Sequence, residues 1–147
     1  MIRKATAYDV PGLRAGIDIL TALCESADGL GVADLATRTG ANKHMVFRCL
    51  KTLVDKGWVT ETGEGPKYAA TLVPFHYASK PVARMDIVTA AQEPLSALWK
   101  RTGECVYLGV MRDDKVMYLI HYEGTRNVHL GGRVGERYWP HAAAAGK

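Results

Sequence analysis

Basic and amide side chains gather in residues 41–57, where they could bind nucleic acid. Asp55 alone opposes the positive charges of this window, so about three of the chain's +4 net charge fall here. Arginine and lysine donate hydrogen bonds to guanine edges and phosphates, and asparagine pairs with adenine. The candidate contact residues are Asn42, Lys43, His44, Phe47, Arg48 and Lys51. A solvated helix face is the alternative interpretation of the charges and of His44, and Phe47 could pack either on a thymine methyl group or in a dimer.

A helix-turn-helix is predicted to position these side chains. A helix of about two turns ends at Gly40, and Asn42 can cap a further helix over 43–56. Ala36 is small enough for the helices to cross closely, Gly40 permits the tight turn, and Val46 fills the angle between the helices. An ordinary helical corner without a DNA role could carry the same three residues.

A preceding helix and a following hairpin complete the predicted domain. From Pro11, four apolar residues recur at helical spacing and predict one buried face: Leu13, Ile17, Leu20 and Leu23. Strand-like runs at 57–61 and 67–70 flank a turn and predict a hairpin after the third helix. Three helices followed by a hairpin predict a winged helix-turn-helix domain over residues 1–71. Lys67 in the wing and Arg14 in the first helix are expected to contact the DNA backbone.

The rest of the chain predicts a linker over 72–85 and part of an α/β domain over 86–147. The helix from Asp86 is expected to end at Gly103, with Pro94 either kinking it or marking a second start. Strands are predicted at 104–111 and 116–121 around a hairpin turn, with a possible third at 127–130 and a loop at 131–137. Such a sheet with one helix would leave an unpaired edge and an uncovered apolar face.

Residues 142–147 resemble the first turns of a helix. Free backbone amides there could hold a carboxylate, whereas the alternative is that these small residues only let the helix pack.

Other function classes find little support in the sequence. No catalytic constellation, zinc-ligand spacing or dinucleotide-binding glycine motif occurs, so no enzyme, catalytic residue, metal or cofactor is predicted. Apolar runs are too short to cross a membrane, and the start lacks the apolar core of a signal peptide, so we expect a cytoplasmic protein. The three cysteines are expected to be reduced.

Several motifs in a fixed order extend through most of the chain. They are GLRAGIDIL at 12–20, LATRTG at 35–40, VFRCLKTL at 46–53, KGWV at 56–59, TGECVYL at 102–108, GRVG at 132–135 and HAAAAGK at 141–147. With these motifs the chain resembles the IclR family of bacterial transcription regulators. The resemblance implies an α+β protein: a winged helix-turn-helix, a linker helix and the first part of a GAF-like effector-binding domain that continues for roughly a hundred further residues in the family.

The resemblance also implies partners and a ligand. We expect a double-stranded DNA operator, a homodimer or tetramer, and a small organic acid effector near Gly132, His141, Ala142 and Ala143. The alternative is a small-molecule-binding or dimerisation fragment with impaired DNA binding. Two departures bear on that alternative: Asn42 to Met45 replace the family's usual Pro-Lys-Ser-Thr, and Thr60-Glu61 stand where the wing often carries basic residues.

Overall fold

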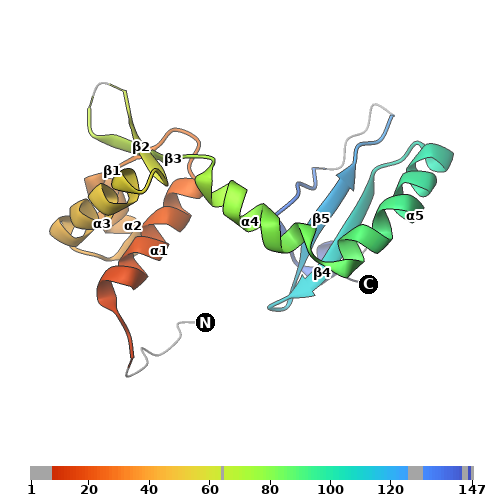
Figure 1. The fold of residues 1–147 in the computed structure, drawn as a ribbon, viewed down its shortest axis with the longest axis horizontal. Helices are drawn as coiled ribbons and strands as arrows, with labels where there is room; N and C mark the ends of the chain where they lie inside the picture. The colour runs from red at the N-terminus through yellow and green to blue at the C-terminus, as the bar shows by residue number, and fades with distance from the viewer. Residues whose placement is uncertain (1–7, 64, 126–130, 144–145, 147) are drawn as a thin grey trace. The chain divides into compact units, whose positions relative to one another are not determined.

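The computed structural model describes residues 8–63, 65–125, 131–143 and 146 (Figure 1). The chain divides into two compact units, one ending at Tyr77 and the other beginning at Ala78. The elements of the first unit are α1 (Pro11–Cys24), β1 (Leu30–Gly31), α2 (Val32–Thr39), α3 (Lys43–Asp55), β2 (Val59–Thr62) and β3 (Lys67–Ala70). The three strands form an antiparallel sheet in the order β1-β3-β2, so the predicted wing gains a short third strand that the sequence analysis lacked.

Local signals fix the turn between α2 and α3. Gly40 caps α2 in the left-handed conformation, with φ of 70°, which glycine adopts without steric cost. The Asn42 side chain begins α3 by accepting a hydrogen bond of 2.8 Å from the backbone N–H of Met45. Both caps confirm the prediction, and α3 ends at Asp55, one residue before the predicted end.

One hydrophobic core joins the three helices to the hairpin. Its fully buried side chains include Leu35 of α2 together with Val46 and Leu50 of α3. Val59 of β2 and Tyr68 of β3 close the core from the sheet. The predicted apolar face of α3 is confirmed for Val46 and Leu50, whereas Leu53 is only partly buried.

The predicted core face of α1 is wrong for Leu13 and Ile17, whereas Leu23 is buried as predicted and Leu20 packs partly buried against the core. The helix buries Ala15, Ile19 and Leu23, whereas Leu13 and Ile17 are 63% and 57% exposed. The helix carries two apolar stripes at helical spacing, and periodicity alone does not tell which stripe faces α2 and α3.

The second unit contains most of the remaining elements, and the division between the units falls inside α4. They are α4 (Val73–Ala83), α5 (Asp86–Thr102), β4 (Val106–Arg112), β5 (Lys115–Tyr122), β6 (Arg137–Tyr138) and a 3-10 helix at Pro140–Ala142. Pro94 lies inside the continuous α5, and Gly103 caps that helix as predicted. Asp113 and Asp114, both with positive φ, form the two-residue hairpin turn between β4 and β5.

Both faces of the β4-β5-β6 sheet carry packed side chains, contrary to the predicted uncovered face. On one face, Trp99 of α5 stacks with Tyr122 and donates a hydrogen bond to the carbonyl oxygen of Glu123. On the other, Ala143 packs with Val116 and Tyr118. The segment from Gly131 therefore folds back over the sheet.

The loop predicted at 131–137 is confirmed for residues 131–136, whereas Arg137 already belongs to β6, a short strand that pairs with β5 and was not predicted. Ala142 lies in a 3-10 turn and Ala143 has extended backbone angles (φ −123°, ψ 139°), so neither belongs to an α-helix. Residues 144, 145 and 147 of the predicted helix start lie outside the described residues. The strand predicted at 127–130 lies outside the described residues.

The burial of Leu50 predicts a large loss of stability on truncation. Leu50→Ala should lower the free energy of unfolding by about 2–5 kcal/mol, because a cavity opens between the helices. Leu72→Ala is the control, since Leu72 is 80% exposed, and should change stability by less than about 0.5 kcal/mol. Urea unfolding followed by helical circular dichroism measures both, and equal effects would contradict this placement of the core.

Candidate nucleic-acid interface

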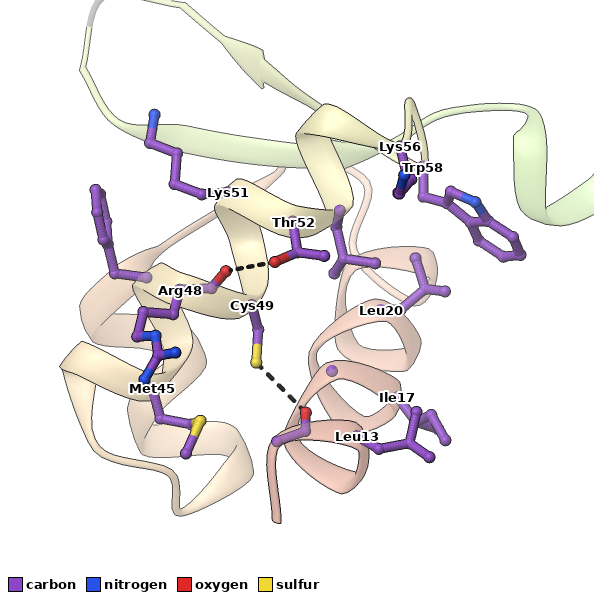
Figure 2. A pocket seen from close by; sticks show the side chains of 14 residues that line it. Leu13, Ile17, Leu20, Met45, Arg48, Cys49, Lys51, Thr52, Lys56 and Trp58 are labelled. Atoms are coloured by element: carbon purple, nitrogen blue, oxygen red, sulfur yellow. Dashed lines mark hydrogen bonds between the residues drawn. The ribbon is translucent and has the colours of Figure 1, made fainter. Parts of the chain in front are cut away.

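The outer face of α3 presents a group of polar and basic side chains. Lys43, His44, Phe47, Arg48 and Lys51 are all exposed on this helix. Because Val46 and Leu50 are fully buried on the opposite side, the helix is held with this face toward solvent. Four of the eight predicted DNA-contacting residues (His44, Phe47, Arg48 and Lys51) therefore lie on the outer side of α3, and Figure 2 shows Arg48 and Lys51 projecting from it. Lys43, two turns before Leu50, is exposed because it begins the helix.

Asn42 has a structural role at the start of this helix. Its side-chain oxygen accepts the hydrogen bond from Met45, so that oxygen is occupied by the cap. A bidentate contact with adenine uses the amide oxygen and nitrogen together. Asn42 thus offers its amide N–H groups but not the full adenine-reading pair while the cap is in place.

Lys51 is held by an acidic residue of the wing. Its ammonium lies 2.8 Å from a carboxylate oxygen of Glu61 on β2 and 5.5 Å from the centre of the Phe47 ring. The hydrogen bond and charge of Lys51 lower the pKa of the Glu61 carboxyl, and Glu61 raises the pKa of Lys51 in return. The ion pair spans α3 and β2, so sequence reasoning noted the acidic wing residue without finding its partner.

The two remaining predicted contacts lie on other elements. Arg14 of α1 is bound to Asp9, with a nitrogen–oxygen distance of 2.8 Å, so part of its charge is neutralised. Lys67 begins β3 and is exposed, opposite Thr62 in the hairpin register. Lys43 and Arg48 of α3 differ from Lys51 and Arg14, because neither forms an ion pair within the described part of the chain.

The predicted effector residues of the second unit occupy different environments. Ala143 is buried in the core beside Tyr118, whereas His141 and Ala142 are exposed. His141 stacks on Trp139. Gly132 lies against the Tyr107 and Tyr118 rings so closely that a Cβ atom there would approach them to 2.9 and 3.0 Å.

An aromatic group on the sheet face was not found from the sequence. The Tyr107 ring stacks in parallel with His121 at 4.4 Å and tilts against Tyr118 at 4.5 Å. Tyr118 also packs against Tyr138 of β6. Burial raises the pKa of Tyr107, and the buried Nε2 atom of His121 has no hydrogen-bond partner among the described residues. These rings meet because of the register between neighbouring strands. The alternation of residues along a single strand does not predict that register.

The described residues contain neither a cluster that could hold a metal ion nor a helix that could span a membrane. No group of three or more histidine, cysteine, aspartate or glutamate side chains is arranged to hold a metal ion there. None of the described helices is long and apolar enough to cross a membrane.

Comparison with known proteins shows one family along the chain. The IclR helix-turn-helix domain matches residues 13–63, and the C-terminal domain of the bacterial transcriptional regulator IclR matches residues 79–147. The HTH-type transcriptional regulator KdgR of Dickeya chrysanthemi is 31% identical over 129 residues, which are 88% of this chain and 42% of the relative. The chain thus spans about half the length of the curated relatives it matches.

Solved structures show the same fold. An IclR family transcriptional regulator from Brucella abortus has a TM-score of 0.79 at 19% identity, covering 99% of this chain and 55% of that one. An IclR homologue from Microbacterium hydrocarbonoxydans, solved in complex with 4-hydroxybenzoate, has a TM-score of 0.76 at 18% identity, covering 92% and 56%.

The Lys51–Glu61 pair predicts a measurable shift in acidity. Lys51→Met should return the pKa of the Glu61 carboxyl to the ordinary glutamate value of about 4.3, because the ammonium that stabilises the carboxylate is lost. Carbon NMR of the carboxyl group against pH measures this. Lys56→Met is the control. It removes the ammonium that pairs with Asp55, and the pKa of the Glu61 carboxyl should stay lowered.

The sign of the pH dependence follows from the lowered pKa. The pair contributes stability above the ordinary glutamate pKa and loses it as pH falls through the lower folded-state value. An unchanged Glu61 titration in Lys51→Met would show that the pair does not form in solution.

Proposed function

Because the chain belongs to the IclR family of bacterial transcriptional regulators, we propose that it binds a double-stranded DNA operator by placing α3 in the major groove. The observation that carries this proposal is the exposed basic face of α3, backed by the fully buried Val46 and Leu50. A helix anchored on one side by a core and free on the other is what major-groove recognition requires. The family consists of transcriptional regulators, and this function needs no catalytic group.

Arg48 and Lys43 are the proposed principal contacts. Arg48 can donate two hydrogen bonds to one guanine, and Lys43 and His44 can reach a base or phosphate near the start of α3. Lys51 contributes less while Glu61 holds it, since a phosphate must compete with a carboxylate at 2.8 Å. Lys67 and Arg14 are proposed as weaker backbone contacts, and Arg14 must first release Asp9.

The second unit is proposed to bind a small organic acid. The support is its aromatic face, in which Gly132 lies directly on Tyr107 and Tyr118, together with the 4-hydroxybenzoate bound by a structural relative. An aromatic carboxylate can stack on such rings, and His141 and Ala142 are exposed nearby along the chain. Ala143 would act through packing, since it is buried. We place the whole regulator in the cytoplasm, as a homodimer or tetramer on its operator.

One observation favours the alternative of a ligand-binding or dimerisation fragment with impaired DNA binding. Two of the predicted DNA contacts, Lys51 and Arg14, already form ion pairs with carboxylates. Salt dependence separates the two functions, because each phosphate contact contributes a slope of about 0.9 in the logarithm of the binding constant.

Removal of Arg48 tests the proposed function. Arg48→Ala should weaken binding to operator DNA from the chain's own upstream region by about 1–3 kcal/mol, because a bidentate base contact is lost. Lys100→Ala in α5 is the control for one lost positive charge. Fluorescence anisotropy on operator and random DNA measures both. An unchanged operator affinity excludes Arg48 from the interface, and an equal loss on both DNAs makes it a phosphate contact.

Release of Lys51 should strengthen binding. Glu61→Gln removes the carboxylate that holds the ammonium, so affinity for all DNA should rise and the salt slope should steepen by about one phosphate contact. Glu136→Gln, which removes a carboxylate from the second unit, is the control for one lost negative charge. If both variants bind alike, Lys51 does not reach the DNA.

A further inference from the structure

The Phe47 side chain is an apolar ring on the polar outer side of α3. The residue is 46% exposed, and exposed side chains surround it along the helix, those of His44, Arg48 and Lys51. Single apolar residues are common on protein surfaces, so exposure by itself assigns no role to the ring. Its neighbours do restrict what it can contact, because a surface that covers Phe47 also meets Arg48 and Lys51.

The charges beside the ring favour a polyanion over a protein as its contact. Charged residues are depleted at the centre of protein–protein interfaces. A second copy packed on this face would bring lysine and arginine side chains against lysine and arginine. DNA presents the opposite arrangement, with phosphates along the edges of the major groove and base edges on its floor. An apolar ring among cations is complementary to that pattern.

The major groove offers an apolar group to such a ring. Among the four unmodified bases only thymine carries a methyl group there, and phenylalanine is one of the side chains that contact it. Burial of one methyl group between a ring and a base strengthens binding by about fourfold. A base that lacks only this methyl group therefore binds more weakly although its hydrogen bonds are unchanged.

An ion pair with the wing holds the ring in place. The ammonium of Lys51 lies 5.5 Å from the centre of the Phe47 ring and 2.8 Å from a carboxylate oxygen of Glu61. Glu61 stands opposite Tyr68 in the hairpin register, and Tyr68 is buried in the core, so an anchored strand carries the carboxylate. The attraction between the ammonium and the ring face restricts the rotation of the ring. A ring that is ordered before binding loses less conformational entropy when it meets a base.

We propose that Phe47 reads the methyl group of a thymine in the operator, and that Glu61 acts through Lys51 as a positioning residue for the ring. This contact rests on the proposed function, in which α3 lies in the major groove. Adjacent Cα atoms are about 3.8 Å apart and base pairs follow one another at about 3.4 Å, so the thymine lies within about two base pairs of the guanine proposed for Arg48. The ion pair thus serves recognition besides restraining the charge of Lys51.

Replacement of single thymines by deoxyuridine tests the methyl contact. Deoxyuridine lacks only the methyl group and keeps the O4 acceptor and the base pair. In duplexes from the chain's own upstream region that each carry one such replacement, the affinity of the parent chain should fall about fourfold at one thymine of a half-site or more. Phe47→Ala should bind the thymine and deoxyuridine duplexes equally at that position. Fluorescence anisotropy measures both affinities.

Phe75→Ala is the matched control. The chain contains two phenylalanines, and Phe75, which lies in α4, is 70% exposed, so this variant should keep the full difference between the two duplexes. A difference that persists in Phe47→Ala, or a parent chain that shows none at any thymine, overturns the methyl contact while operator binding stands. A parent chain that binds its upstream DNA no better than random DNA overturns the proposed function and the methyl contact together.

Glu61→Gln tests the positioning role in the same assay. The variant releases Lys51, so affinity for all DNA should rise, whereas the ratio between the thymine and deoxyuridine duplexes should fall below about twofold because the ring is no longer held. A change in overall charge or stability alters both affinities alike and leaves their ratio intact. Glu136→Gln is the control and should keep the full ratio. An unchanged ratio in Glu61→Gln overturns the role of Glu61 as a positioning residue.

Discussion

The burial of Val46 and Leu50 is the constraint on which the proposed DNA-binding surface depends. These two side chains, one helical turn apart, hold α3 against α1, α2 and the hairpin with no exposed surface of their own. Once they are fixed, the helix period places His44, Phe47, Arg48 and Lys51 on the solvent side, and Lys43 is exposed at the first position of the helix. The rigid left-handed turn at Gly40 and the cap at Asn42 set where that helix begins. The basic face is thus a consequence of the core.

Electrostatics then divides the basic side chains into free and restrained groups. Glu61 reaches Lys51 from the wing, and Asp9 reaches Arg14 from the residues before α1. Both pairs are solvent-accessible, so each contributes little to stability. In the proposed function each cation must exchange its carboxylate for a phosphate, which lowers its contribution to affinity. Arg48 and Lys43 have no such restraint among the described residues, which concentrates proposed base recognition near the first half of α3.

Sequence reasoning succeeded where the signal is local. Gly40, Asn42 and Gly103 mark helix ends through their own backbone or side-chain chemistry, and the structure confirms all three. It failed on α1, where two apolar stripes have the same helical period. Only packing against α2 and α3 determines which stripe is buried. It also failed where partners are distant in sequence: the Lys51–Glu61 pair, the β6 strand and the aromatic group around Tyr107 depend on register between strands or on contacts between elements. The candidate effector residues do not share one environment, because Ala143 is buried in the core whereas His141 and Ala142 are exposed, and their role toward an effector stays a prediction.

Hydroxyl-radical footprinting of this chain on its own upstream DNA, with excess random DNA present and salt raised to physiological strength, tests the central claim most directly. The account predicts protected patches that survive competition, centred about one helical turn apart in related half-sites. Protection that vanishes with competitor, or spreads evenly along the DNA as salt is lowered, would contradict sequence recognition by α3 and leave only phosphate attraction.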